Sequence, residues 1–216
     1  MNASIQFSIY LVVLVASVLC CIYRFPQLDN AAKFIGLFLL STLVSESVGF
    51  YMAWKYHNNM PVYHFAAPVH FLMICLYYNS WLDVLRKRNI GLYLGLAGIP
   101  LAVINALVLQ PVYTLNSYFL LFEGTCIISM SLLAFYRMLD NERVRIMRYP
   151  HFWLSYIFLF FWSLTYINWA MYRLLGEKVA GAIPFIGVLL WFINVATYMC
   201  LGIVIFLYPA KISARE

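Results

Sequence analysis

Residues 183–208 read IPFIGVLLWFINVATYMCLGIVIFLY and contain no Asp, Glu, Lys, Arg or His. A helix needs roughly 20 consecutive apolar residues to cross the hydrocarbon core of a bilayer, which is about 30 Å thick. This stretch is long enough to do so. It therefore predicts a transmembrane helix and not the core helix of a soluble domain.

Six further apolar runs of similar length precede this one. Their bounds are 5–23, 33–54, 61–82, 91–109, 116–138 and 151–173. Polar or helix-breaking residues separate them, including Asp29 and Asn30, either of which could cap the second helix. The sequence thus predicts an all-α integral membrane bundle of seven transmembrane helices, which forms a single domain over residues 1–216.

The composition of the whole chain agrees with this pattern. Of 216 residues, 65% are hydrophobic and only 10% are charged, whereas a soluble domain carries about 25% charged residues. These values exclude a water-soluble globule, a disordered chain and a nucleic-acid-binding protein, so the lipid bilayer is the expected partner. The five cysteines all lie within apolar runs without a CxxC spacing, and they predict neither disulfides nor a metal site.

The basic residues give the bundle an orientation. Eleven of the 14 Lys and Arg residues lie in the loops after the first, third and fifth runs or in the C-terminal tail. Only Lys55, Arg173 and Lys178 lie on the other side. Cytoplasmic loops of membrane proteins carry an excess of Lys and Arg, so we expect the N-terminus outside and the C-terminus in the cytoplasm.

Several polar residues lie within the apolar runs, where charged groups are costly and usually face the bundle interior. At a helical rise of about 1.5 Å per residue, all of them fall in the outer half of the membrane, and Glu46, His70 and Glu123 share one depth. We therefore expect an outward-facing polar pocket. Its predicted lining residues are Glu46, His70, Glu123, Asn194, Trp191, Asn168 and Tyr63.

Several other polar residues and glycines are expected to have structural roles only. Asn105 is expected to form hydrogen bonds between helices, and Gly91, Gly95 and Gly98 form a smooth strip suited to close helix contact. His57 and His151 lie at the ends of predicted spans, so we assign them no special role.

The stretch Asn58-Asn59-Met60-Pro61-Val62-Tyr63-His64 carries a family resemblance, together with Glu123, Pro150-His151-Phe152-Trp153, and Trp191 with Asn194. These residues are similar to those of a family of seven-helix membrane proteins frequent in Bacteroidota, for which no activity is established. The resemblance extends from about the second helix to the seventh. It implies a multi-pass protein of the bacterial inner membrane, and it implies nothing about substrate.

Three functions compete. The favoured hypothesis is a non-enzymatic protein that binds or senses a small-molecule ligand at the outer pocket, with a cytoplasmic protein as a further partner at the basic loops. The alternative is an intramembrane metal-dependent hydrolase acting on a lipid or amide, with Glu46, His64, His70 and Glu123 as metal ligands. A proton- or cation-coupled transporter is third.

The sequence favours the non-enzymatic hypothesis. It contains no pair of histidines in a His-x-x-x-His spacing, so we expect neither a metal nor another cofactor, and we identify no catalytic residue. Retinal is excluded because residues 183–208 contain no lysine to carry it.

Overall fold

The computed structural model describes residues 3–140, 146–175 and 182–209, which form helices and contain no strand. The long helices are α1 (Ala3–Arg24), α2 (Asn30–Tyr56), α3 (Met60–Trp81), α5 (Ile90–Ile104), α6 (Ser117–Leu139), α7 (Pro150–Leu175) and α8 (Ala182–Phe206). Short elements join them: the 3-10 turns Phe25–Gln27 and Ile146–Arg148, α4 (Asp83–Arg86), and a π-helical turn, Asn105–Leu109, that extends α5.

Six of the long helices are apolar and long enough to cross a membrane, which confirms the prediction of an all-α membrane protein for the described residues. They are α1, α2, α3, α5 with its π-turn, α6 and α8. The remaining long helix, α7, has 26 residues and is not among the six.

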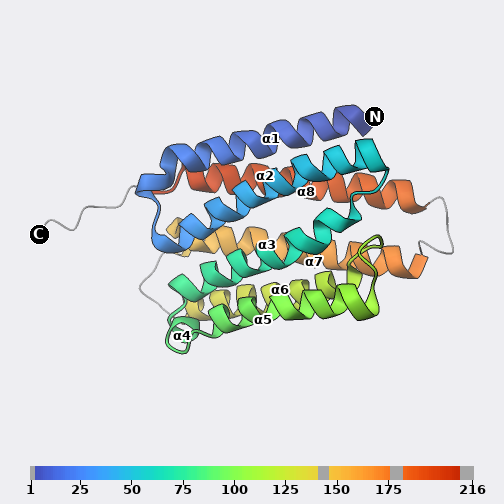
Figure 1. The fold of residues 1–216 in the computed structure, drawn as a ribbon. Coiled ribbons are helices and arrows are strands. Elements are labelled where there is room, and N and C mark those ends of the chain that lie inside the picture. The colour runs from blue at the N-terminus through green and yellow to red at the C-terminus, as the bar shows by residue number, and fades with distance from the viewer. Residues whose placement is uncertain (1–2, 141–145, 176–181, 210–216) are drawn as a thin grey trace, which may run out of the picture.

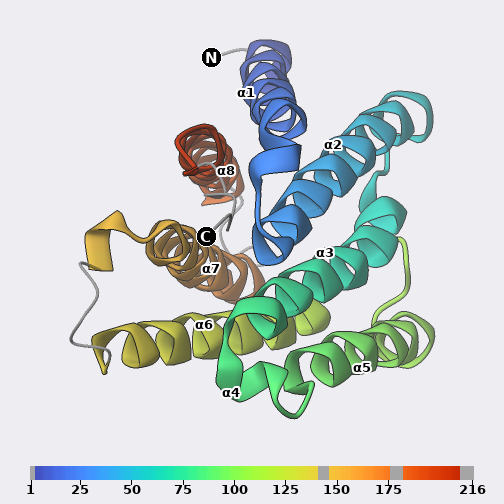
Figure 2. The same ribbon diagram turned by 90° about the vertical axis from the view of Figure 1, so that its left-hand side faces the viewer.

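Consecutive long helices run antiparallel along one common direction (Figure 1). The pairs α1–α2, α2–α3, α3–α6, α6–α7, α7–α8 and α8–α1 are all in contact, so these six helices close into a ring. Helix α5 lies outside the ring, against α3 (Figure 2).

Glycines explain how closely α5 approaches α3. A Cβ atom at Gly91 would lie 2.7 Å from the backbone oxygen of Cys75, and one at Gly95 would lie 3.2 Å from the Cα of Leu72. Both distances are too short for a larger side chain, because the atoms in the way belong to the backbone of α3. The predicted glycine strip is thus the contact surface between α5 and α3.

Aromatic side chains fill the middle of the ring. The Phe38 ring of α2 lies 6.0 Å from Phe158 and 6.5 Å from Tyr198, measured between centroids, and Tyr77 lies 5.9 Å from Phe158. Edge-on and tilted pairs at these distances stabilise a core beyond the area that they bury.

The charged residues are divided unequally between the two ends of the bundle. We use the name basic end for the end that carries Arg24, Arg86, Lys87, Arg88, Arg137 and Arg148. The last residues of α8 reach this end, while the described start of α1 lies at the opposite end, beside the turn between α2 and α3 (Figure 1).

Candidate functional site

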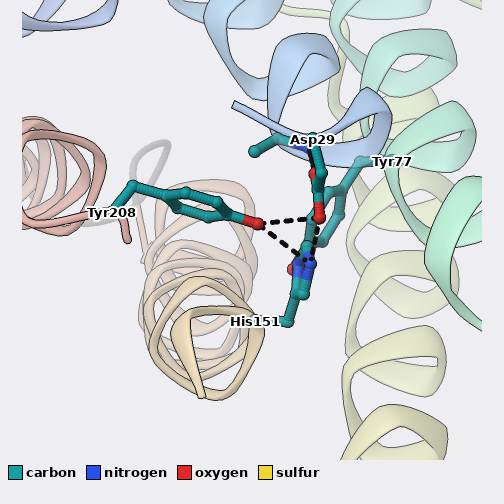
Figure 3. A network of polar contacts seen from close by, with 5 residues as sticks. Asp29, Tyr77, His151 and Tyr208 are labelled. Atoms are coloured by element: carbon teal, nitrogen blue, oxygen red, sulfur yellow. Dashed lines mark hydrogen bonds and ion pairs between the residues drawn. The ribbon is translucent and has the colours of Figure 1, made fainter. Parts of the chain in front are cut away.

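A network of polar side chains lies at the basic end and joins α3 and α7 to the residue that precedes α2 and to a residue just after α8 (Figure 3). Asp29 is the N-cap of α2, and its Oδ1 accepts a hydrogen bond from the Ala32 amide at 2.7 Å. Its Oδ2 lies 2.9 Å from His151 Nε2 and accepts a hydrogen bond from the Tyr208 hydroxyl at 2.8 Å. The hydroxyl of Tyr77, on α3, lies 3.3 Å from His151 Nδ1. We call these four side chains the Asp29–His151 network.

Local sequence places each member. Asp29 follows the turn after α1, where a short acidic side chain can satisfy the free amides at the start of α2. His151 is the second residue of α7, directly after Pro150, and Tyr208 follows the last turn of α8. Arg24, at the end of α1, donates a hydrogen bond to the Tyr208 carbonyl, so all the helices of the ring except α6 take part or lie directly beside the network.

Aromatic rings enclose His151, which is only 2% exposed. The Trp81 ring stacks on the imidazole with 4.9 Å between centroids and 10° between planes. Tyr149 lies at 5.1 Å and Tyr77 at 5.7 Å. These rings and the Asp29 carboxylate together fix the position of the imidazole.

The network also shifts the acidity of its members outside the helices. Burial alone would raise the pKa of Asp29, but hydrogen bonds from His151, the Ala32 amide and Tyr208 lower it well below its usual value. Burial and the neighbouring Asp29 raise the pKa of Tyr208, so its phenol remains a proton donor. The carboxylate of Asp29 is therefore ionised throughout the physiological range.

The same geometry suits two protonation states of His151. In the neutral imidazole, Nε2–H donates to Asp29 while Nδ1 accepts from the Tyr77 hydroxyl. In the imidazolium both nitrogens donate, and the Tyr77 hydroxyl becomes the acceptor. The Asp29 side chain is 38% exposed, so water reaches the pair and can exchange protons with it.

The predicted outer residues do not form one hydrogen-bonded cluster in the described part of the chain. The Tyr63 hydroxyl donates to Glu46 Oε2 at 3.3 Å, and this is a contact between α3 and α2. The His70 ring packs edge-on against Phe38, and its Nε2 is buried without a hydrogen-bond partner. Glu46, His70 and Glu123 make no hydrogen bond with one another.

Glu123 and Asn168 are the most deeply buried of the predicted residues, at 1% and 3% exposed. Oε2 of Glu123 and both amide atoms of Asn168 have no hydrogen-bond partner among the described residues. The neighbouring Gly124 faces the rings of Trp162 and Tyr166 on α7. Glu123 therefore lies in apolar surroundings.

The other predicted residues have local roles or only partial burial. Trp191 Nε1 donates to the backbone oxygen of Gln6 at 2.7 Å and holds α8 against α1. Asn194 is half-buried, near the middle of α8. Asn105 donates to Asn116 Oδ1 at 2.6 Å, which confirms its predicted role between helices, and His64 Nε2 lies 2.9 Å from the Thr114 carbonyl.

The described residues contain no group of three or more His, Cys, Asp or Glu side chains placed to hold a metal ion. Glu46, His64, His70 and Glu123 all belong to this part of the chain. The ligand set of the hydrolase hypothesis therefore does not converge.

The interpretation of His151 as a span-end residue without a special role is wrong. The histidine is buried and contacts Asp29, Tyr77 and Tyr208, because the start of α7 packs into the ring and does not lie on its surface. The charge pattern of the sequence could have indicated that His151 lies near Asp29. The orientation inferred from the basic loops places residue 29 and residue 151 at the same membrane face.

Comparisons with protein-family models, with curated proteins and with solved structures give no match to this chain.

Proposed function

We propose that the chain is a seven-span protein of the bacterial inner membrane, with its N-terminus outside and its C-terminus in the cytoplasm. Helix α7, with 26 residues, would be the seventh span, since it packs between α6 and α8 within the ring. The gathering of basic residues at one end of the bundle supports the orientation. A reporter fused after Glu216 should be active only in the cytoplasm, and activity outside the cell would overturn the orientation.

We further propose that the protein binds or senses a small ligand without catalysis. In this proposal, the Asp29–His151 network couples a rearrangement of the helices on ligand binding to the cytoplasmic end of the bundle. The observation that carries this proposal is the convergence of Asp29, Tyr77, His151 and Tyr208 on one point. A shift of α2, α3, α7 or α8 against the others would break at least one of these bonds. Perturbed ionisable groups held in this way are candidates for function.

The charge of His151 would select between two arrangements. Histidine is the side chain whose charge changes nearest to neutral pH. The groups that face it are the Asp29 carboxylate and the hydroxyls of Tyr77 and Tyr208, with the Tyr149 ring beside it and Arg24 beyond Tyr208. A protonated His151 makes a charge-assisted bond to Asp29, which is stronger than the neutral bond and holds the start of α7 against the start of α2, where the Tyr208 hydroxyl also binds.

Hydrogen–deuterium exchange measured from pH 6 to pH 9 tests this coupling. After correction for the intrinsic rate, exchange of the amides of residues 203–208 should increase with pH in the wild-type protein. It should be independent of pH in His151→Gln. The control His57→Gln alters an exposed histidine at the opposite end and should behave like the wild type. A flat wild-type profile, or the same rise in His151→Gln, would contradict the proposal.

A further inference from the structure

A groove of about 630 Å³ runs between α7 and α8 on the outside of the ring. It begins at the basic end beside Arg148 and Leu207 and extends to Phe160 on α7 and Ala196 on α8. Its lining is mostly apolar, and Arg148 is the charged residue in it.

The length of the groove restricts what can occupy it. From Pro150 to Phe160 on α7, and from Leu207 to Ala196 on α8, the helical rise gives about 15 Å. This is about half of the hydrocarbon thickness of a bilayer, so the groove reaches from one membrane surface to the midplane. A transmembrane helix of a partner would need a contact surface along the full thickness. A lipid chain needs one leaflet only.

The basic end of the groove is suited to a phosphate group. Arg148 is exposed there, at the level where lipid headgroups lie, and its guanidinium can bind phosphate in a bidentate manner. Trp153, also in the lining, is held in place because its Nε1 donates to the Met147 carbonyl at 2.9 Å. Tryptophan at this depth is typical of contact with the interfacial part of a lipid.

A second apolar groove provides a comparison within the same molecule. It lies between α1 and α8, has a volume of about 420 Å³ and is lined by residues such as Ala16, Cys20 and Phe206, with no charged side chain. The α7–α8 groove differs from it in having a cation at the membrane surface.

We propose that the α7–α8 groove binds one acyl chain of an anionic phospholipid of the cytoplasmic leaflet, with the lipid phosphate at Arg148. The assignment to this leaflet rests on the orientation given above. Binding itself does not, because the groove and Arg148 are the same in either orientation. Failure of lipid binding would therefore leave the orientation intact, and a reversed orientation would change only the leaflet.

Native mass spectrometry of the full chain in a non-ionic detergent tests the proposal, with phosphatidylglycerol and phosphatidylcholine of identical acyl chains added in parallel. One phosphatidylglycerol should bind in preference to phosphatidylcholine. Arg148→Gln should weaken phosphatidylglycerol binding about fivefold, the weight of one basic residue at an anionic surface, and weaken phosphatidylcholine binding less, because the choline cation offsets the charge of that lipid's phosphate. Arg88→Gln, at an exposed arginine outside the groove, is the charge control and should change neither.

Filling the groove gives the second arm of the test. Ala196→Trp should abolish binding of both lipids, whereas Ala16→Trp, in the α1–α8 groove, should not. If Ala196→Trp does not fold, Cys200→Phe fills the same groove one turn later. Inorganic phosphate at millimolar concentration should not displace the lipid, since the chain supplies most of the contact. Equal binding of the two lipids, or binding that survives a filled groove, would overturn the proposal.

Discussion

Asp29 and Glu123 are both acidic residues of an apolar bundle, but their surroundings are opposite. Asp29, at the basic end, accepts hydrogen bonds from a backbone amide and a tyrosine and pairs with a histidine. Glu123, within α6, is almost completely buried, and its Oε2 has no partner among the described residues. The depth of an acidic residue in the bundle determines how much free energy its burial costs. Its hydrogen-bond partners determine how much of that free energy is offset.

The position of each residue along its helix accounts for the difference. The first amides of a helix have no partner within it, so a carboxylate at the N-cap finds donors ready. In the middle of a helix the backbone donors are already used, and a carboxyl group there depends on side chains of neighbouring helices. Around Glu123 those neighbours include the rings of Trp162 and Tyr166, which lie beside Gly124.

The largest expected effect comes from removing the centre of the network. His151→Ala deletes a buried ring and removes the hydrogen bonds that the imidazole makes with Asp29 and Tyr77, so it should reduce the free energy of unfolding by about 2–4 kcal/mol. Unfolding of the purified protein in mixed micelles measures the change.

The matched control is the exposed histidine at the other end of the bundle. His57→Ala should cost less than about 1 kcal/mol, because the side chain is exposed and the backbone hydrogen bond by which His57 caps α2 in the left-handed conformation is available to alanine as well. If the two alanine variants lost similar stability, His151 would be no more than another residue at a helix end.

A smaller effect is expected when the charge of Asp29 is removed and its shape is kept. Asp29→Asn retains an oxygen that can cap α2 but loses the carboxylate that pairs with His151 and accepts from Tyr208, and we expect a loss of about 1–2 kcal/mol because the side chain is partly exposed to water. Asp83→Asn removes an exposed carboxylate paired with Arg86 and should cost far less. If Asp83→Asn lowered the free energy of unfolding as much as Asp29→Asn, the distinction between the partly buried Asp29–His151 pair and the exposed Asp83–Arg86 pair would be wrong.

Acidification should remove the contribution of Asp29 gradually. Because its pKa is lowered in the folded protein, the carboxylate stabilises the fold above its unfolded pKa of about 3.9, and this contribution is lost as the pH falls below that value. The difference in stability between the wild type and Asp29→Asn should therefore be constant from about pH 6 to about pH 5 and shrink below pH 4. A difference that grew on acidification would reverse the inferred sign.

The fold was largely predictable from the sequence, and the network was not. Long apolar runs and their breaks determine where helices begin and end, so the structure has α-helices close to the seven predicted runs. Glycines at a spacing of three and four residues predicted a surface for close helix contact, and the structure shows that its partner is α3. Both are local patterns of the sequence, and they predict the same helices whichever neighbours those helices pack against.

The Asp29–His151 network depends on which helices become neighbours. Asp29 and His151 are separated by 122 residues, and each looks ordinary in its own segment as a helix cap and a helix start. The sequence also could not show that Glu46 would meet Tyr63 while Oε2 of Glu123 would have no hydrogen-bond partner among the described residues. Those contacts depend on the rotation of each helix about its axis. The runs are apolar almost throughout, so the sequence does not specify that rotation.

Glu123 gives the smallest expected effect and the sharpest test of the contrast with Asp29. Glu123→Gln has the same shape and cannot carry a charge, so it should leave stability unchanged or raise it by up to about 1 kcal/mol, because no ionic bond is lost and no charge has to be buried. Glu46→Gln is the control on another helix of the ring: it weakens the bond from Tyr63 and should cost about 0.5–1.5 kcal/mol. Both changes can be measured by unfolding in the same micelles at pH 7. A loss of more than about 1 kcal/mol in Glu123→Gln would mean that the carboxylate has a cationic partner, and the outer half of the bundle would then hold a charged site of the kind found at the basic end.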